Sequence, residues 1–352
     1  MVVGVLLVNL GTPLSSNDSD VKRYLTEFLT DKRVIDLSWW KRQLLVRGRI
    51  VRKRYRESAR TYRSIWTKAG SPLLMHGQKV KERLQERLGN GFSIALSMRY
   101  QFPSIHEGLL SLRHCHRLVI LPLFPQYASA TTGSVYEEVM RRLSSWRMIP
   151  ELRFVHSFPM QKKMVRVFAE NTKACVLKHY DHILMSFHGL PKRQLQHNDP
   201  RGKGDCCQRE PDCCMHLGEE NRLCYVAQCN ATARAIAGEL GLDSQQYTLC
   251  YQSRLGKEEW LQPYFSEELK RLAKGGMKKL LVLSPSFVCD CLETLDEIAV
   301  GYAKEFKKLG GERLDLVPGL NDHPLWIEAL CDLINDEEAL NRQRKVNEAV
   351  EG

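Results

Sequence analysis

Three side chains in the second half of the chain could carry acid–base or metal chemistry, and all three follow expected strands. Glu293 and Glu297 are four residues apart at the start of an expected helix, so their carboxylates lie on one face. That helix follows Leu280 to Leu283, an apolar run typical of a buried parallel strand. His188 follows a second such run, His182 to Phe187. With an ordinary pKa near 6.5, an imidazole suits proton removal or transfer of a metal ion.

These positions coincide with the place where open α/β sheets form ligand crevices, outside the carboxyl ends of their strands. Two plainer interpretations stay open. The glutamates could form a solvated pair on an exposed helix face, and a histidine at a strand end is often structural. An internal repeat favours the functional interpretation.

The same layout of apolar strand, short loop and proline occurs twice, with three matching pairs in the same order. The pairs are Val3–Pro13 with His182–Pro191, the stretch from Ala95 with that from Thr248, and Arg117–Val139 with Lys279–Val300. Such a repeat predicts two βαβ-rich halves of one design. Facing each other across a cleft, their strand ends would bring His188, Glu293, Arg99 and Tyr127 towards one site.

Composition is that of an ordinary globular protein. The chain has 352 residues, 43% of them hydrophobic and 26% charged, enough for two domains. No apolar run approaches the ~20 residues that span a bilayer. The apolar start, VVGVLLVNLG, lacks the basic region and cleavage site of a signal peptide and is expected to form the first strand. We therefore expect a bacterial cytoplasmic protein.

The net charge of +11 is concentrated in one stretch. Residues 41–60 hold nine Lys or Arg against one acid, Glu57, and follow Trp39 and Trp40. The interleaved apolar residues predict a basic amphipathic helix, which is attracted to anionic membrane surfaces. A solvated basic face on an inward-packing helix is the alternative. Nucleic acid is not expected as a partner, because no recognised binding module accompanies the charge.

Twelve cysteines without a signal peptide favour reduced or metal-bound thiols over disulfides. Six are scattered and are expected to be small core residues. The other six lie within 24 residues: Cys206, Cys207, Cys213, Cys214, Cys224 and Cys229.

Six motifs in order resemble those of a ferrochelatase, the enzyme that inserts Fe²⁺ into a porphyrin. They are LLVNLGTP, AGSPL, LPLFPQYASATTG, SFHGLP, CYQSRLGKEEWLQP and SFVCDCLETLDEI. The resemblance covers Val3 to Ala329, almost the whole chain. It implies an α/β chelatase fold: two similar Rossmann-like domains with parallel sheets and the porphyrin between them. We expect these domains over residues 1–149 and 150–322, and a C-terminal helix and tail over 323–352.

The resemblance also implies roles for residues. His188 would remove pyrrole protons or hand over the metal, and Glu293 and Glu297 would form an acidic path for metal or protons. Arg99 would bind a propionate in bidentate fashion. The implied porphyrin-binding residues are Leu10, Arg99, Tyr100, Tyr127, Ser129, Thr131, Thr132, Trp260 and Phe287. An apolar lip at about residues 36–55, with Trp39, Trp40 and Leu44, would face the membrane from its cytoplasmic side.

Three positions depart from the family pattern. Cys291 stands where the family often has His, two residues before the first glutamate. Gly301 stands where a third acidic residue is common, one turn after Glu297. Leu10 replaces a Met or Tyr, so a strong axial contact from that face is not expected.

The implied reaction is insertion of Fe²⁺ into protoporphyrin IX to give protohaem, the final step of haem biosynthesis. Alternatives are a coproporphyrin III chelatase, a cobalt or nickel chelatase, and a non-catalytic tetrapyrrole-binding or iron–sulfur sensor protein. The cysteine-rich insertion, about residues 192–229, resembles more loosely the cluster-bearing segments of some bacterial relatives. Four of its six cysteines would hold a [2Fe–2S] cluster, with zinc or free thiols as alternatives. A monomer or a dimer is compatible with the sequence.

Overall fold

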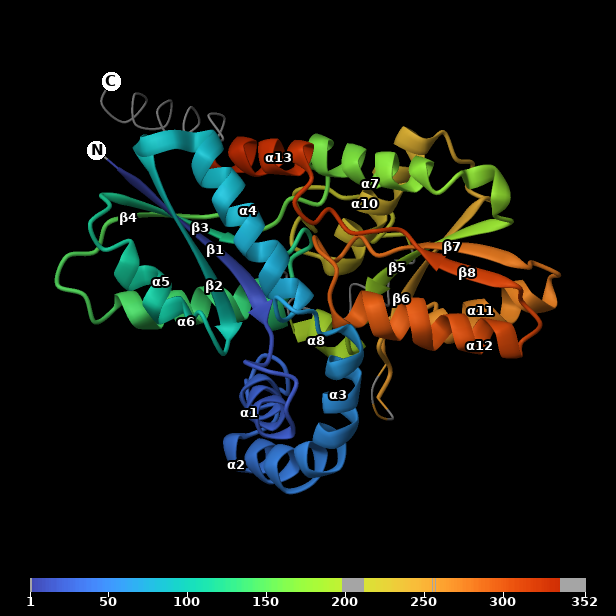
Figure 1. The fold of residues 1–352 in the computed structure, drawn as a ribbon, viewed down its shortest axis with the longest axis horizontal. Helices are drawn as coiled ribbons and strands as arrows, with labels where there is room; N and C mark the ends of the chain where they lie inside the picture. Colours follow the sequence, from blue (N-terminus) through green and yellow to red (C-terminus); the bar gives the residue numbers. More distant parts are fainter. Residues whose placement is uncertain (1, 198–211, 255, 257, 336–352) are drawn as a thin grey trace.

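Two parallel four-stranded sheets form the centre of the protein (Figure 1). The computed structural model describes residues 2–197, 212–254, 256 and 258–335. The first sheet has the order β2-β1-β3-β4 and the second β6-β5-β7-β8. The first contains β1 (Val3–Gly11), β2 (Phe92–Tyr100), β3 (Arg117–Pro122) and β4 (Glu151–Phe154). The second contains β5 (His182–His188), β6 (Tyr247–Gln252), β7 (Lys279–Leu283) and β8 (Arg313–Leu316). The expected α/β class with two similar parallel sheets is confirmed.

Helices cover both faces of each sheet (Figure 1). The helices of the first half, those near the lip included, are α1 (Asp18–Leu29), α2 (Trp39–Gln43), α3 (Val51–Ile65), α4 (Pro72–Leu88), α5 (Ile105–Ser111) and α6 (Ser134–Leu143). In the second they are α7 (Lys162–Ala174), α8 (Lys192–His197), α10 (Tyr225–Leu240), α11 (Phe265–Lys274), α12 (Ala303–Lys308) and α13 (Pro324–Asn335). Three π-helical segments are η1 (Leu44–Ile50), η3 (Ser129–Gly133) and η5 (Glu293–Tyr302); Gly89–Gly91 and Leu177–His179 are short 3₁₀ turns.

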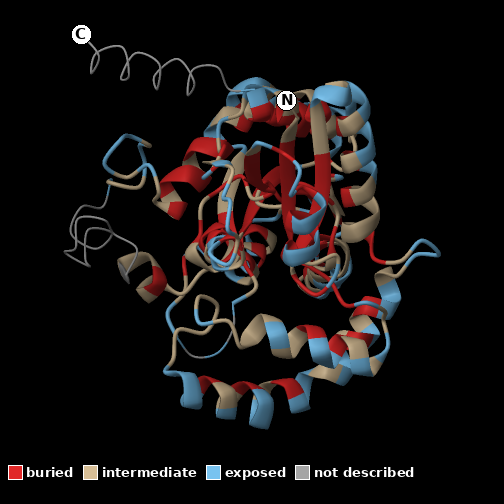
Figure 2. Cartoon of the chain, turned by 90° about the vertical axis from the view of Figure 1, so that its left-hand side faces the viewer, coloured by how far each residue is buried: buried red, intermediate tan, exposed pale blue. Residues whose placement is uncertain are grey.

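The inner strands β1, β3, β5 and β7 are mostly apolar and have both faces buried, as the red strands inside Figure 2 show. The edge strands β4 and β8 are short and partly exposed. Alternate residues of β1 serve two cores: Val5 and Leu7 pack with α4 and α7, and Leu6 and Val8 with α5 and α6. β5 and β7 alternate in the same way. One core contains residues of both sheets together with α4, α7, α10 and α13, so the two halves share buried apolar contacts.

The internal repeat is confirmed in detail. Each half has the same strand order, and the connections after β2 and β6 share two features although they differ in length. Both turns have a residue with positive φ, Gln101 at 69° and Ser253 at 67°, and a cis proline, Pro103 and Pro263. The two Pro carbonyls accept hydrogen bonds from Met98 in β2 and from the corresponding strand β6. The sequence pairing therefore matched corresponding elements of the two halves.

The boundary expected at residues 149 and 150 is one strand too early. β4 pairs in parallel with β3, Arg117 opposite Glu151, so residues 151–154 belong to the first sheet. The C-terminal helix α13 is not a separate appendage either, because it packs on α4 and α7 and buries Trp326 in the shared core.

The helix after β7 was expected to be an α-helix from about Leu292 to Leu309. It begins instead as a π-helix, η5, and becomes the α-helix α12 only at Ala303. Apolar spacing could not distinguish the two forms. In a π-helix the hydrogen bonds run from i to i+5, and such segments are frequent at functional sites.

From Trp39 onward the lip is helical, as α2, η1 and the start of α3, and together with α1 it lies below both sheets, blue in Figure 1. Its exposed apolar side chains are Trp39 (70%), Trp40 (59%) and Leu44 (70%). Eight of the nine cations of residues 41–60 are exposed. The exception is Arg42, which is buried and donates to the carbonyls of Thr30 and Leu37. Among the described residues, no helix combines the length and apolarity needed to cross a bilayer.

Candidate functional site

His188 is held rigidly at the carboxyl end of β5. Its backbone N–H donates to Ser286 Oγ (3.2 Å), and its carbonyl accepts from the Tyr225 hydroxyl (2.8 Å). In the side chain, Nδ1 lies 2.7 Å from the carbonyl oxygen of Gly189. Because a carbonyl can only accept, Nδ1 carries a proton, so a neutral imidazole has its lone pair on Nε2. The hydrogen bond also fixes the orientation of the ring.

Aromatic side chains flank this histidine. The Phe287 ring meets the His188 ring edge to face, with centroids 6.3 Å apart. Gly189 lies between Trp260 and β6: a Cβ there would be 3.2 Å from the Trp260 ring and 2.8 Å from the Gln252 carbonyl. Any larger residue would displace one of them. Phe287 thus lies against the His188 ring, and Trp260 lies against the adjacent Gly189.

Glu297 is fixed on η5 by three hydrogen bonds. Its Oε2 accepts from Ser253 Oγ (2.6 Å) and Gln252 Nε2 (3.4 Å), and its Oε1 from the Tyr302 hydroxyl (3.3 Å). Gln252 lies opposite His188 in the register of β5 and β6. Its Nε2 also donates to the backbone carbonyl of Glu293 (3.3 Å). One buried amide therefore joins the strand that bears His188 to both glutamates.

The Glu293 carboxylate lies beside weakly acidic groups. Burial raises the pKa of the Cys291 thiol well above its ordinary value, and the adjacent Glu293 charge raises it further. Burial first and Glu293 next also raise the pKa of Tyr24, and Glu293 contributes to the raised pKa of Tyr62. These neighbours stay protonated near neutral pH, so they do not compete with Glu293 as bases.

Leu10 lies next to the same group of aromatic residues. It packs on the cluster formed by Tyr24, Tyr62 and Tyr100, which also receives Leu292 of the second half. The end of β1 therefore approaches the start of η5, at the base of the lip. The contacts of Leu10 in this cluster are apolar and aromatic.

Three of the expected porphyrin-binding residues are not placed to contact a ligand as predicted. Tyr100 and Thr132 are 0% exposed, so both are core residues. Arg99 was expected to bind a propionate, but its Nε donates to Ser134 and its Nη2 to Asp31 (2.7 Å). The sequence pattern could not reveal this, because a position at a strand end does not show which nearby group the side chain binds.

The loop before α6 has the expected partly buried residues Tyr127, Ser129 and Thr131. The Tyr127 N–H donates to Gln228 Oε1 on α10 (2.6 Å), which links this loop to the second half. Ser129 Oγ accepts from Arg33 Nη1 (2.8 Å). The loop is thus held from both halves.

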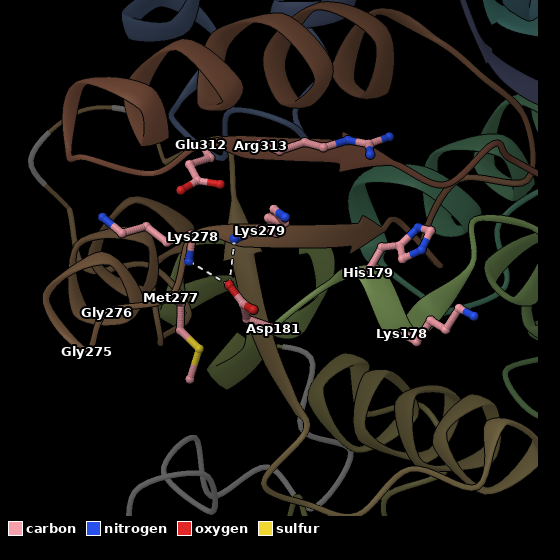
Figure 3. Close-up of a pocket in the computed structure, with 10 residues that line it drawn as sticks. All are labelled: Lys178, His179, Asp181, Gly275, Gly276, Met277, Lys278, Lys279, Glu312 and Arg313. Atoms are coloured by element: carbon pink, nitrogen blue, oxygen red, sulfur yellow. Dashed lines mark hydrogen bonds between the residues drawn. The ribbon is translucent and has the colours of Figure 1, made fainter.

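A separate hollow of about 950 Å³ lies at the opposite edge of the second sheet (Figure 3). Its lining includes the starts of β7 and β8, Lys279 and Arg313, whereas His188 ends β5. Asp181, just before β5, accepts from the backbone N–H groups of Lys278 (2.7 Å) and Lys279 (2.8 Å). This charged hollow does not suit an apolar macrocycle and is distinct from the His188 site.

The cysteine-rich insertion is only partly described. Cys206 and Cys207 lie outside the described residues. Cys214 Sγ is 3.6 Å from Cys213 Sγ and 4.0 Å from Cys224 Sγ. Cys229 was a candidate ligand, but it is 0% exposed on α10, and burial raises its thiol pKa well above the ordinary value. It is a core residue.

No group of three or more His, Cys, Asp or Glu within the described part of the chain is arranged to hold a metal ion.

Sequence reasoning missed the residues that hold His188, namely Tyr225 and Ser286. Ser286 directly precedes Phe287 and is the first residue of the recognised motif SFVCDCLETLDEI. Its position after β7 was the available signal, since adjacent parallel strands end at one edge. Tyr225 begins a helix after an aperiodic stretch, and nothing in the local pattern places its hydroxyl near β5.

Comparison with known proteins agrees with this geometry. The family model described as Ferrochelatase matches residues 2–338. A ferrochelatase of Legionella pneumophila strain Philadelphia 1 is 43% identical over 334 residues, covering 95% of this chain and 99% of its own. One of Coxiella burnetii strain Dugway 5J108-111 is 42% identical over 337 residues, covering 94% and 92%.

Among solved structures, SirB from Bacillus subtilis with Fe³⁺ matches with a TM-score of 0.51 at 13% identity, covering 96% of this chain and 98% of that one. At that identity the match shows a shared fold. The sequence matches extend over nearly the whole chain and include the strand ends that hold His188 and Glu293. The chain therefore belongs to the ferrochelatase family, enzymes that insert Fe²⁺ into a porphyrin.

Proposed function

We propose that this chain inserts Fe²⁺ into protoporphyrin IX to give protohaem, with His188 as the proton acceptor. The observation that supports this most is the state of the imidazole. Nδ1–H donates to Gly189, so Nε2 has a free lone pair, and both backbone groups of His188 are hydrogen-bonded. A positioned base of this kind can remove a proton from a substrate held at the strand ends.

The reaction must release two pyrrole protons for each dication that enters the ring. His188 Nε2 takes up pyrrole protons and passes them to solvent. The macrocycle is held by apolar contact with Phe287 and Trp260, beside His188, and by the loop of Tyr127, Ser129 and Thr131. Apolar walls favour a flat aromatic ligand and exclude water from its centre.

Glu293 and Glu297 form the acidic path for iron or protons along η5. Glu297 is fixed by Ser253, Gln252 and Tyr302, whereas Glu293 lies nearer the aromatic cluster. Carboxylate oxygens bind Fe²⁺ weakly enough for release into the ring nitrogens. Cys291 stands where the family often has His, and its thiol stays neutral here. The acidic path therefore does not depend on a second imidazole.

The cysteine-rich insertion is proposed to hold a [2Fe–2S] cluster. Support comes from six cysteines within 24 residues and from the approach of Cys213, Cys214 and Cys224 Sγ atoms to 3.6 and 4.0 Å in succession. Cys213, Cys214 and Cys224 with Cys206 or Cys207 would be the ligands, since thiolates are the usual ones. When bound, the cluster would order the insertion, because metal-binding energy becomes folding energy.

The lip is proposed to associate with the surface of an anionic membrane. Trp39, Trp40 and Leu44 are exposed next to eight exposed cations of residues 41–60. Exposed apolar residues beside basic ones are typical of helices that lie at a bilayer surface. Porphyrins partition into membranes, so the lip would lie where the substrate is.

The test is anaerobic incubation of the purified protein with Fe²⁺, Co²⁺ or Ni²⁺ and either protoporphyrin IX or coproporphyrin III. Loss of free-base fluorescence measures insertion. Highest turnover with Fe²⁺ and protoporphyrin IX supports the proposal, and preference for coproporphyrin III or another metal selects the corresponding alternative. Binding of porphyrin without insertion of any metal would indicate a carrier or sensor. Iron and acid-labile sulfide measured on the same anaerobic sample test the cluster, and absence of both would contradict it.

A further inference from the structure

A turn at the base of the lip, residues 31–33, contains a nearly buried acid. The Asp31 side chain is 6% exposed. Its Oδ2 accepts three hydrogen bonds: from Ser134 Oγ (2.5 Å), Arg99 Nη2 (2.7 Å) and the Tyr100 hydroxyl (2.9 Å). Its Oδ1 accepts from the backbone N–H of Arg33 (2.7 Å). A buried carboxylate with four donors strongly favours one arrangement of its partners.

These donors come from separate parts of the first half. Arg99 and Tyr100 end β2, whereas Ser134 is the first residue of α6, directly after η3. Asp31 itself lies between α1 and the lip helices. One carboxylate thus ties the base of the lip to a strand end and to the loop of Tyr127 and Ser129.

The two following residues strengthen the same connection. Lys32 Nζ and Arg33 Nε bind the carboxylate of Glu137 in α6, both at 2.6 Å. Arg33 Nη1 also donates to Ser129 Oγ (2.8 Å). A Cβ on Gly133 would lie 3.2 Å from Arg33 Nη1 and 3.4 Å from the Tyr127 hydroxyl oxygen. Arg33 therefore packs against η3 from the lip side.

We propose that Asp31 is a positioning residue that holds the porphyrin-binding loop, residues 127–134, in register with the lip. This inference rests on the proposed function, which places the macrocycle on that loop. The segment η3 is a five-residue π-helical turn, and its own backbone bonds do not determine where it lies relative to the lip. Asp31 supplies that constraint through Ser134, and Arg33 supplies it through Ser129.

The two halves therefore have separate roles in this proposal. His188, Glu293 and Glu297 all lie in the second half, whereas the Asp31 carboxylate accepts hydrogen bonds from first-half groups, those of Arg33, Arg99, Tyr100 and Ser134. Loss of Asp31 should weaken porphyrin binding and leave the chemical step nearly intact. A purely structural ion pair would lower stability without this selectivity.

The test compares Asp31→Asn with Glu138→Gln. Glu138 is a matched control, because it lies on the same helix as Glu137 and its 14% exposed side chain binds Arg141 and Arg142, away from the loop. Protoporphyrin IX binding without metal gives Kd, steady-state insertion gives KM and kcat, and urea unfolding gives stability. For Asp31→Asn we expect Kd and KM to rise about tenfold or more and kcat to change less than about twofold. Glu138→Gln should lower stability and leave Kd and KM unchanged.

Ser134→Ala is the milder second variant, because Arg99 and Tyr100 keep their bonds to Asp31. We expect it to raise Kd by about threefold, and it decides the question if Asp31→Asn does not fold. A folded Asp31→Asn protein with wild-type Kd and KM would overturn the proposal, as would an unchanged Kd in Ser134→Ala or an equal rise in Glu138→Gln. Wild-type protein that binds porphyrin but inserts no metal would count against the proposed function alone, since Kd still tests the positioning role.

Discussion

The hydroxyl of Tyr225 should matter for catalysis because it holds the backbone of His188. It is buried and donates to the His188 carbonyl at 2.8 Å. Tyr225→Phe removes this donor with almost no change of shape. The His188 carbonyl at the end of β5 then lacks the hydrogen bond from Tyr225. Loss of one such bond lowers stability by about 1 kcal/mol, and an unsatisfied buried partner raises the cost to about 1–3 kcal/mol.

The catalytic effect follows from the same geometry. The backbone of His188 is then held only by Ser286 and the β5 ladder, so Nε2 loses part of its fixed position. If about 1 to 2 kcal/mol of the lost interaction is felt in the transition state, kcat falls about 5- to 30-fold. Porphyrin affinity should stay the same because Phe287 and Trp260 are untouched.

Tyr251→Phe is the matched control. Tyr251 is 3% exposed, and its hydroxyl has no hydrogen-bond partner among the described residues. Removing it should be neutral or slightly stabilising, since a buried polar group without a partner costs stability. Urea unfolding and steady-state insertion by both variants check the pair. A Tyr225→Phe enzyme with wild-type kcat, or equal losses in both variants, would refute the reasoning.

Three further predictions follow from the site and the lip. Glu293→Gln should lower kcat strongly with little change in porphyrin Kd, because the amide keeps the shape and loses the charge; an unchanged kcat would return Glu293 to a structural role. Replacing Trp39 and Trp40 by Ser should weaken binding to anionic vesicles, and the remaining binding should fall with salt; a wild type that ignores vesicles at low salt would contradict this. Burial raises the pKa of Tyr24, Tyr62 and Tyr225, so unfolded chains lose these protons above about pH 10 while the native state retains them. The free energy of unfolding should thus fall as pH rises above that value, and urea midpoints that stay constant between about pH 8 and 11 would contradict it.

The fold could be predicted largely from sequence because its signals are local and repeated. Apolar runs of four to nine residues mark strands buried on both faces. The match of Val3–Pro13 to His182–Pro191 identified β1 and β5 as corresponding strands of the two halves. The placement of β4 failed for a physical reason. A short edge strand has no local feature that says which sheet it joins, and only its register with β3 decides.

Side-chain partners were harder to predict than elements. Motif position pointed to Phe287 and Trp260, and these side chains lie against His188 and Gly189, because strand ends and the loops after them determine such contacts. It failed for Tyr100 and for Arg99, because Asp31 reaches them from a turn about 70 residues away in sequence. Such long-range polar contacts leave no periodic signal in one sequence. The π-helical form of η5 was missed for a similar reason, since apolar spacing alone does not separate it from an α-helix.

The central claim is that Nε2 of His188 takes protons from the porphyrin. Its most direct test is His188→Ala, with porphyrin binding and anaerobic Fe²⁺ insertion measured on the same preparation. We expect the variant to bind porphyrin with nearly wild-type Kd, because the apolar walls remain, and to have lost insertion. Near-normal insertion of Fe²⁺ by the folded variant would contradict the assignment of His188 as the proton acceptor.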